Sequence, residues 1–522
     1  MTDHLSSGLL LTLPQDILYV ILTYCPLQDV LNCRITHPIL QRTAERTLKE
    51  WVYRLTVRIP DLALPIKDAE KAFLLPYRTD PLYRRCATRL HITLEAWAPG
   101  LGPATVGKWL AKLVSLPERL LEVEIRLTTR HEWRIRQLLL VLGKPGNVLR
   151  SLRLSSLDLP YLLDVPLSES SPDSVVPSLL GTPQPTFPHL RHLTCIIPSV
   201  RCFLQIPQIA PNVETLSLLE LGTPVQLSEE EMISFFRRIP HITSLSFHRS
   251  FSASMLVLAL ARAFPQPSAL PSPPPPTLST SASPSSSSPR IRSRLRKLGI
   301  LRSYITYPVG QEQEMLEDEK IRARIAFTAL LNSTIQLEEL MYDGPIGKEA
   351  SKILASAIAP TIQRLLLSQS RGLHLSSVPV WPQLSTLSLH RCDSIRFWDP
   401  AKETMEPPAR FPRLSVLFMR GCTSDRYGPP PLDHVPFMQS VTMDITSLAD
   451  LHGFLPPRGA ASLVFLASRP VDLDDIVGIC LASGLHNLQI QCADKHYIPL
   501  LRQAFTEGIK KRGTSLKALE IL

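Results

Sequence analysis

One short pattern recurs through most of the chain and restricts the folds that are open to it: apolar-x-x-apolar-x-apolar, where x is any residue. Alternating residues of a strand point to opposite faces, so the apolar members share one face and the x residues share the other. One strand with one return segment cannot bury its own apolar face, so the copies must stack. The copies begin at Leu120, Leu149, Val213, Ile242, Leu295, Leu337, Ile362, Leu384, Leu414, Met438, Leu485 and Leu516, with looser copies at Leu190 and around Leu463.

The spacing of these copies is close to that of leucine-rich repeats. From Leu337 to Met438, successive copies begin 25, 22, 30 and 24 residues apart, and leucine-rich repeats recur every 20–29 residues or so. Between copies lie helical patterns, as at 229–238 and 317–331. The pattern therefore predicts an α/β fold, a leucine-rich-repeat-like solenoid in which short parallel strands and helices form a horseshoe.

The first 55 residues have a different pattern, which predicts three short helices. Pro14 suits the first turn of a helix, where its missing N–H costs nothing, and Cys25-Pro26 ends that helix because the residue before proline is disfavoured in the α region. Four apolar residues fall at helical spacing, which predicts that they share one face: Ile17, Leu18, Ile21 and Leu22. A third amphipathic helix is expected from Ile39 to Leu55.

The order of residues in this segment resembles the F-box, the helical module by which substrate receptors of SCF-type ubiquitin ligases hold the Skp adaptor. The resemblance rests on 13–18 (Leu-Pro-x-Asp-Ile-Leu), 26–31 (Pro-Leu-x-Asp-Val-Leu) and a helix end that contains Trp51. The alternative is a plain helical cap on the repeat array, whose end must be covered in any case. The resemblance implies the following adaptor-binding residues: Leu13, Pro14, Ile17, Leu18, Ile21, Leu27, Val30 and Leu31.

Two cysteines follow their repeat copies at the same offset. Cys392 and Cys422 each lie eight residues after the first leucine of a copy, which is similar to the cysteine-containing repeats of F-box leucine-rich-repeat proteins. We interpret both as ladder residues inside the turn, neither metal ligands nor nucleophiles. In other copies the same position holds Leu157, Leu221 or Ser370.

Composition limits the compartment and the partners. The chain carries nine scattered cysteines without a Cys-x-x-Cys pair, which favours a reduced intracellular protein, cytoplasmic and/or nuclear. The longest apolar runs are broken before 18 residues, so no membrane span is expected. The net charge is +10, but the 56 basic and 46 acidic residues are mostly interspersed, so nucleic-acid binding is not favoured.

One segment interrupts the array. Residues 265–289 are rich in proline and serine and cannot build a core, so a disordered loop is expected at 265–293. The expected organisation is thus an F-box-like module at 1–55, a first part of the solenoid at 56–264, the loop, and a second part at 294–522. The loop is an inert spacer, a site of phosphorylation beside the arginines that follow it, or a polyproline ligand at its four consecutive prolines.

We find no pattern that predicts an active site. The chain has no glycine-rich phosphate loop and no His-Glu-x-x-His motif, so we expect neither an enzyme nor a cofactor. His192 and Cys195 could suggest a metal, but the strand alternation places them on opposite faces. No metal site is therefore expected.

The outward strand residues are the better candidates for binding. Aromatic and arginine side chains gathered on one surface are typical of interface hot spots, which singles out His390, Phe418, Arg420 and Trp398 as target-binding candidates. The alternative is that the tryptophans are buried in the return segments.

These predictions favour a substrate-recognition subunit of an SCF-type ubiquitin ligase. As the resemblance implies, such a receptor would bind the Skp adaptor and the cullin ligase core through its F-box and an unknown target protein through the repeat face. The alternative is a non-catalytic leucine-rich-repeat scaffold without ligase association.

Overall fold

The computed structural model describes a repeat protein that divides into two compact units, Met1–Val213 and Glu214–Leu522. The residues that it describes are 13–25, 27–50, 54–59, 88–94, 120–127, 139–140, 142–143, 148–158, 162, 185–197, 199–219, 227–248, 252–266, 293–301, 312–392, 394–395, 397, 410–422, 434–445, 455, 458–465, 473–492 and 495–522. Of the predicted loop at 265–293, all but Pro265, Gln266 and Ser293 lie outside these ranges.

The first unit begins with three helices: α2 (Gln15–Tyr24), α3 (Leu27–Thr36) and α4 (Pro38–Glu50). They enclose a small core made of Leu22, Val30, Ala44 and Leu48. Cys25 adopts an extended conformation, with φ −78° and ψ 148°, and terminates α2 as predicted from the proline that follows it. Pro14 is the N-cap residue of α2, one position before the first turn that we predicted for it.

The third helix is shorter than predicted. It ends at Glu50, and Arg54 already begins strand β1 (Arg54–Ile59), so Leu55 belongs to a strand and not to the helix. Ala44 and Leu48 of this helix are both fully buried, which agrees with the amphipathic pattern predicted for it. The helical module and the first strand therefore follow one another within a few residues.

Parallel strands follow in the first unit: β2 (Arg89–Leu94), β3 (Glu122–Leu127), β4 (Ser151–Asp158) and β5 (His192–Ile196). Each strand pairs with the next one in the chain. Three of the predicted repeat copies lie in β3, β4 and β5. Strands β1 and β2 are additional and were not among the predicted copies. Two short helices are the last elements of this unit in the sequence: α9 (Val200–Leu204) and α10 (Ile206–Ile209).

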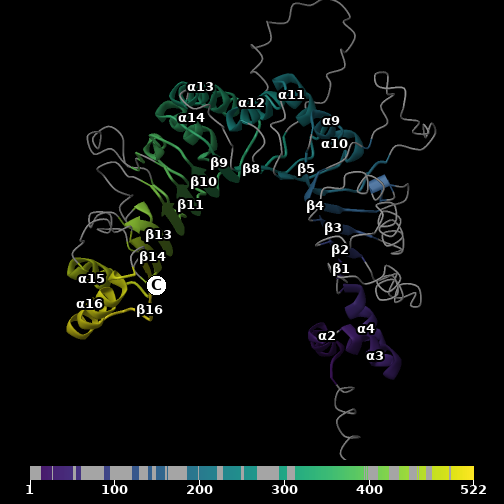
Figure 1. Cartoon of the computed structure of the whole chain (residues 1–522), viewed down its shortest axis with the longest axis horizontal. Coiled ribbons are helices and arrows are strands. Elements are labelled where there is room, and N and C mark those ends of the chain that lie inside the picture. Colours follow the sequence, from purple (N-terminus) through teal and green to yellow (C-terminus); the bar gives the residue numbers. More distant parts are fainter. Residues whose placement is uncertain are drawn as a thin grey trace, which may run out of the picture. The chain divides into compact units, whose positions relative to one another are not determined.

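The second unit continues with one strand per repeat copy, again parallel and in sequence order. Its strands are β6 (Thr215–Leu219), β7 (Ser244–His248), β8 (Lys297–Leu301), β9 (Glu339–Asp343), β10 (Arg364–Ser368), β11 (Thr386–His390), β12 (Val416–Arg420), β13 (Ser440–Ile445), β14 (Ala460–Phe465), β15 (Asn487–Cys492) and β16 (Ala518–Ile521). Its helices are α11 (Glu229–Arg238), α12 (Ala253–Ala263), α13 (Glu312–Leu331), α14 (Lys348–Ile358), the 3₁₀ turn η1 (Leu375–Ser377), α15 (Leu473–Ala482) and α16 (Tyr497–Arg512). Figure 1 shows α11–α14 along one side of β6–β10.

The strand register places the repeat leucines directly beside one another. Leu365, Leu387 and Leu417 occupy paired positions in β10, β11 and β12, and all three are buried. The residues between them alternate to the other face, where they are partly or fully exposed. This confirms the predicted α/β architecture and the inward and outward assignment of these strands.

The turns after β10, β11 and β12 repeat one geometry. Gln369, Arg391 and Gly421 each have positive φ, between 50° and 62°, and the residue that follows each one bonds back to the array. Ser370 Oγ donates to Gly344 O at 3.4 Å, and Cys392 Sγ donates to Leu367 O at 3.4 Å. Cys422 Sγ donates to Leu389 O at 3.3 Å. The prediction that both cysteines are ladder residues is confirmed.

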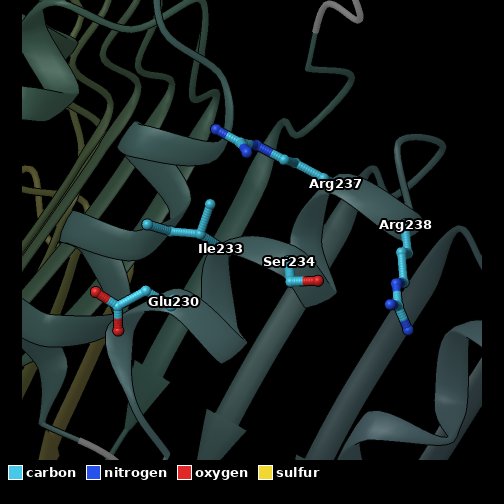
Figure 2. Close-up of a pocket in the computed structure, with 5 residues that line it drawn as sticks. All are labelled: Glu230, Ile233, Ser234, Arg237 and Arg238. Carbon is cyan, nitrogen blue, oxygen red and sulfur yellow. The ribbon is translucent and has the colours of Figure 1, made fainter.

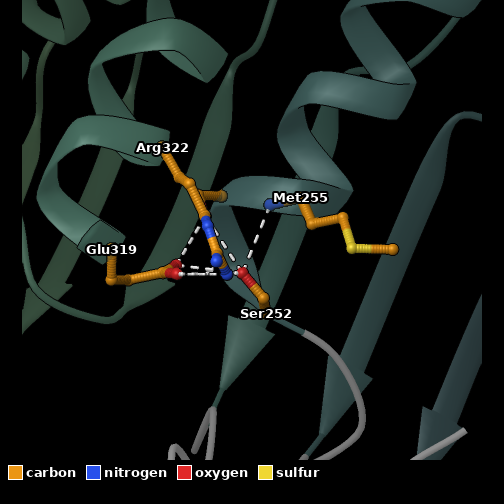
Figure 3. Close-up of polar contacts among 5 residues, drawn as sticks. Ser252, Met255, Glu319 and Arg322 are labelled. Carbon is orange, nitrogen blue, oxygen red and sulfur yellow. Dashed lines mark hydrogen bonds and ion pairs between the residues drawn. The ribbon is translucent and has the colours of Figure 1, made fainter. Parts of the chain in front are cut away.

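A buried carboxylate joins helices α12 and α13 (Figure 3). Glu319 of α13 is buried and accepts a hydrogen bond from Ser252 Oγ at 3.0 Å and one from Ser254 Oγ at 2.5 Å. Ser252 also caps α12 by accepting from Met255 N, and Arg322 lies 3.9 Å from the other carboxylate oxygen. Because a buried charge is tolerated only when it is hydrogen-bonded or paired, this contact fixes how the two helices pack behind the strands.

Candidate interaction surfaces

Helix α2 carries an apolar stripe that its own module does not cover. Ile17, Val20, Ile21 and Tyr24 are 49%, 50%, 39% and 86% exposed. Their spacing of i, i+3, i+4 and i+7 places them on one helical face. A second stripe, Leu18 and Leu22, is buried. Helix α2 therefore has two apolar faces, and only one of them is used inside the module.

This arrangement corrects part of the predicted adaptor-binding set. We predicted that Ile17, Leu18, Ile21 and Leu22 share one face, but neighbouring positions are about 100° apart around a helix, and the pairs diverge. Leu18 and Val30 are 1% and 0% exposed, so their side chains pack inside the module and offer no surface to a partner. Ile17 and Ile21 remain available.

The other predicted adaptor residues have different positions. Pro14 is exposed at the start of α2, and Leu13 is partly buried beside it. The side chains of Leu27 and Leu31 lie outside the described residues. Val20 and Tyr24 were not predicted, although their spacing from Ile17 was a signal that could have identified them.

Polar contacts also link α2 to α4. Arg46 of α4 forms an ion pair with Asp16, with NH1 3.1 Å from Oδ1, and its guanidinium lies 4.8 Å from the centre of the Tyr19 ring. A cation above an aromatic face is attracted by the ring quadrupole. Leu18 and Leu22 point into the module, and Arg46 of α4 lies at the side of α2. The exposed stripe therefore faces away from α4.

A second candidate surface lies on the outward face of β9–β12. Its middle row pairs Met341 with Leu366, Leu366 with Ser388, and Ser388 with Phe418. All four side chains are partly exposed. The apolar members of this row, Met341, Leu366 and Phe418, are partly open to solvent and can accept an apolar group of a partner.

The last outward row brings the predicted target residues together. His390 and Arg420 are paired positions of β11 and β12, as the register predicted. The His390 ring lies 4.8 Å from the Phe418 ring at an angle of 35°, and its Nε2 is 3.0 Å from Ser388 Oγ. His390, Phe418 and Arg420 therefore form one continuous surface.

Arg420 is held in place by an acid of the next strand. Its Nε lies 3.5 Å from Asp444 Oδ1, and the Asp444 side chain is only 8% exposed. Asp444 also accepts a hydrogen bond from the backbone N–H of Gly421. A second ion-paired group lies at the other edge, where Glu339 Oε1 is 2.8 Å from Lys297 Nζ and 3.4 Å from Arg364 NH1. Exposed cations therefore flank the apolar row on both edges.

The predicted aromatic residues outside the strands do not add to this surface. Trp381 and Phe397 are buried. The alternative that the tryptophans are buried in the return segments is therefore correct for Trp381. Its indole Nε1 donates to Leu375 O at 3.2 Å, and its ring stacks on Phe411. Trp398 lies outside the described residues, and its role in target binding stays a prediction.

The environment of His390 lowers its pKa. Desolvation is the largest cause, and the neighbouring Arg420 cation adds to it, whereas Asp343 acts in the opposite direction. Both of the first two causes disfavour the imidazolium. The ring is therefore neutral near pH 7, and Nε2 can accept from or donate to Ser388 according to its tautomer.

We expect nuclear magnetic resonance titration to give His390 a pKa below its ordinary value of 6.5. The folded-state pKa is depressed, so the unfolded chain takes up this proton first as the pH falls. The stability that His390 contributes is present above about pH 6.5 and is lost as the pH drops through the folded-state pKa. Arg420→Gln should raise the His390 pKa but leave it below 6.5, because desolvation remains. If the pKa of His390 were unchanged in that variant, the charge of Arg420 would not act on the His390 ring.

The helical side of the second unit carries two open grooves. One, of about 490 Å³, is lined by residues of α11: Glu230, Ile233, Ser234, Arg237 and Arg238. Figure 2 shows that the two arginines extend in different directions from the end of the helix. The other, of about 430 Å³, lies between α12 and α13 and includes Leu258, Ile321 and Ile325. Neither lining contains a histidine or a cysteine among the described residues.

Groups that could hold a metal are not found within the described ranges, where no three His, Cys, Asp or Glu side chains converge. His192 is exposed while Cys195 is buried, so these two residues diverge as predicted. A search of the same part of the chain for a helix with the length and apolarity to cross a membrane finds none. Comparisons of the sequence with protein-family models and with curated proteins give no match.

Proposed function

We propose that this protein is the substrate-recognition subunit of an SCF-type ubiquitin ligase, with an F-box at its N-terminus and a leucine-rich-repeat-like domain after it. The exposed stripe of α2 is the observation that carries the proposal. A helix that only capped the repeat array would need one apolar face. The stripe formed by Ile17, Val20, Ile21 and Tyr24 is a second face, and an apolar helical face of this size is suited to a partner helix.

The module supports this use because it is complete without the stripe. Its core consists of buried residues from all three helices, Leu22, Val30, Ala44 and Leu48, and Arg46 contacts α2 from the side. A preorganised surface loses little conformational entropy on binding. In the proposed complex, the stripe contacts the Skp-type adaptor, which links the protein to the cullin ligase core.

The target would bind the outward face of β9–β12. Its apolar row and the cations Arg364 and Arg420 at its edges favour a segment that carries an apolar side chain next to an acidic one. Phe418 supplies the aromatic anchor, and Arg420 is preoriented by Asp444. Aromatic and arginine residues of this kind dominate binding energies at protein interfaces. The receptor itself would make and break no covalent bond.

The proposal is tested by binding of the purified full chain to a purified Skp-type adaptor. The double variant Ile17→Asp, Ile21→Asp places two carboxylates on the stripe without touching Leu18 or Leu22. We expect a loss of affinity of roughly 100-fold or more, since two central contacts of an interface are replaced by charges. Isothermal titration calorimetry gives the two dissociation constants.

A matched control exists in the second unit. Ile321 and Ile325 of α13 have the same spacing and are 57% and 47% exposed. The same substitutions there, Ile321→Asp and Ile325→Asp, should leave adaptor binding unchanged. If the wild-type chain does not bind the adaptor, or if both double variants bind equally well, the N-terminal helices are only a cap and the protein is a repeat scaffold without ligase association.

A further inference from the structure

Cys392 and Cys422 occupy the same position in the turns that follow two adjacent strands, β11 and β12. His390 and Arg420 are paired residues of β11 and β12, and Cys392 and Cys422 each lie two residues further on. Cys392 Sγ bonds to Leu367 O and Cys422 Sγ bonds to Leu389 O, which are equivalent carbonyls of successive strands. The two side chains therefore point in the same direction from neighbouring rungs.

This placement puts the two cysteines close to the backbone spacing that a disulfide needs. Adjacent strands are about 4.8 Å apart, and disulfide-linked residues have Cα atoms about 4.4–6.8 Å apart. The two thiols already interact by a hydrogen bond, so a rotation of each side chain away from its carbonyl is the change that a bond between the sulfurs would need. The bonds that would be given up, from Sγ to a backbone oxygen, are weak because a thiol is a poor donor.

The two thiols differ in access and in acidity. Cys392 is fully buried, whereas Cys422 is partly exposed. A hydrogen bond between the two thiols lowers the pKa of Cys422, although burial opposes it, and the same bond raises the pKa of Cys392. The thiolate is the reactive form of cysteine, so Cys422 is the member of the pair that an oxidant reaches and reacts with first.

We propose that Cys392 and Cys422 form an oxidative modification site, in which a peroxide converts the two neighbouring thiols of the turn ladder into an intramolecular disulfide. In the first step, contrary to the interpretation from the sequence that neither cysteine is a nucleophile, the Cys422 thiolate attacks hydrogen peroxide. An S–O bond forms, the O–O bond breaks, and the departing hydroxide takes up the thiol proton as water. The product is the sulfenic acid of Cys422.

In the second step, the Cys392 sulfur attacks the sulfenic acid. The S–S bond forms and the S–O bond breaks. The hydroxyl group then leaves with the proton of Cys392 as a second water. Two thiols are oxidised and one peroxide is reduced, so no further reactant is required. A thiol reductant reverses the reaction by exchange.

The bond would lock the turns beside His390 and Arg420. The backbone N–H of Arg391 already donates to Arg420 O at 2.8 Å, and Gly421 lies so close to Arg391 that an added Cβ would be 3.2 Å from Arg391 Cγ. A disulfide would hold these two turns in register. Its effect on target recognition rests on the proposed function, whereas the reaction itself does not.

The test is peptide mapping of the full chain after exposure to hydrogen peroxide, alkylation of the remaining thiols and digestion without reductant. We expect a linked peptide pair that contains Cys392 and Cys422, and slower amide exchange at Arg391 in the oxidised protein. Both changes should disappear after reduction. A folded chain that yields no such linked pair would overturn the proposal.

Two serine variants give opposite results if the order of steps is correct. Serine fits this turn position, since Ser370 Oγ donates to Ser368 O, two residues back, as the two thiols do to His390 O and Arg420 O, so both variants should fold. In Cys392→Ser, the sulfenic acid of Cys422 has no partner and should be trapped by dimedone. In Cys422→Ser, Cys392 should stay unlabelled because it is buried. Dimedone labelling of Cys392 alone would contradict the assigned roles.

A second pair of cysteines serves as the internal control. Cys195 and Cys202 are also neighbours, but both are buried, and burial raises the pKa of Cys195. They should remain reduced in the same sample. Equal linkage of Cys195 to Cys202 would show general oxidation of an unfolded chain and would defeat the claim of a specific site. Adaptor binding is unaffected by either result, which keeps this test separate from that of the proposed function.

Discussion

Replacement of Trp381 by alanine is expected to lower the free energy of unfolding of the second unit by about 3–5 kcal/mol, the range for large aromatic residues in a core. Trp381 has no exposed surface. Its ring stacks on Phe411, with centroids 6.2 Å apart, and Phe397 packs edge-on against the same Phe411. The change would leave a cavity that these rings cannot fill by a small shift.

The indole N–H provides a second, separable contribution. Nε1 donates to Leu375 O at 3.2 Å, and Leu375 is itself buried at the start of η1. Trp381→Phe keeps an aromatic ring in the stack but removes this donor. An unsatisfied buried carbonyl costs about 1–3 kcal/mol, so this variant should be intermediate between the wild type and Trp381→Ala.

Urea unfolding of the full chain, followed by circular dichroism, measures both variants. A cost below about 1 kcal/mol for Trp381→Ala would mean that the ring is not part of the core. Lys352→Ala, an exposed change on α14 whose ion pair with Glu349 lies at the surface, is the reference and should change stability by less than about 0.5 kcal/mol.

The strand faces could be predicted from the sequence because the signal is local. A period of two residues fixes which side chains share a face, and the copies from Leu337 to Leu414 align without insertions inside the strands. The position of Cys392 and Cys422 followed from the same count. The structure adds the positive φ of the turn residues, which no spacing rule indicates for Gln369 or Arg391.

The two faces of α2 could not be assigned in the same way. Apolar residues at 17, 18, 20, 21, 22 and 24 fit more than one helical stripe, and periodicity cannot say which stripe meets the module's own core. That choice depends on where α3 and α4 lie, which is a tertiary property. As a result, Leu18 and Val30 were placed on the binding surface although they are core residues.

For strands β1 and β2, by contrast, the sequence does contain the repeat pattern, although these two copies were not among the predicted ones. Val52, Leu55 and Val57 have the spacing of a repeat copy, and Ala87, Leu90 and Ile92 have it again. The helical interpretation of the segment up to Leu55 competed with the first of these. A strand that follows directly on a helix is ambiguous in a short window, because three apolar residues fit both periods.

The ion pair of Arg420 could not be predicted from the sequence either. Its partner, Asp444, lies 24 positions later, and the outward position of Arg420 in its strand suggested a side chain surrounded by solvent. The structure instead places a nearly buried carboxylate against it. Arg420 is therefore both part of the candidate target surface and a structural contact, and the two roles must be separated by experiment.

Leu387→Ala and Leu417→Ala are each expected to cost about 2–5 kcal/mol of stability, as truncations at buried and paired positions. His390→Ala, three positions further along β11 on the outward face, should cost less than about 1 kcal/mol, since it loses a partly exposed ring contact with Phe418 and a partly buried hydrogen bond with Ser388. Because Leu387 and His390 both lie in β11, the comparison between them depends on the direction of the side chains and not on the strand. Unfolding in urea measures all three changes.

Arg420→Ala should lie between these groups, at about 1–2 kcal/mol, because it leaves Asp444 nearly buried without its cation. The double variant Arg420→Ala, Asp444→Asn removes that charge as well. It should recover most of the loss, since the amide of asparagine carries no charge and can still accept from Gly421 N. If Arg420→Ala were as costly as Leu387→Ala, and the second change did not restore stability, Arg420 would be a core residue. The outward face of β9–β12 could then not be the target surface.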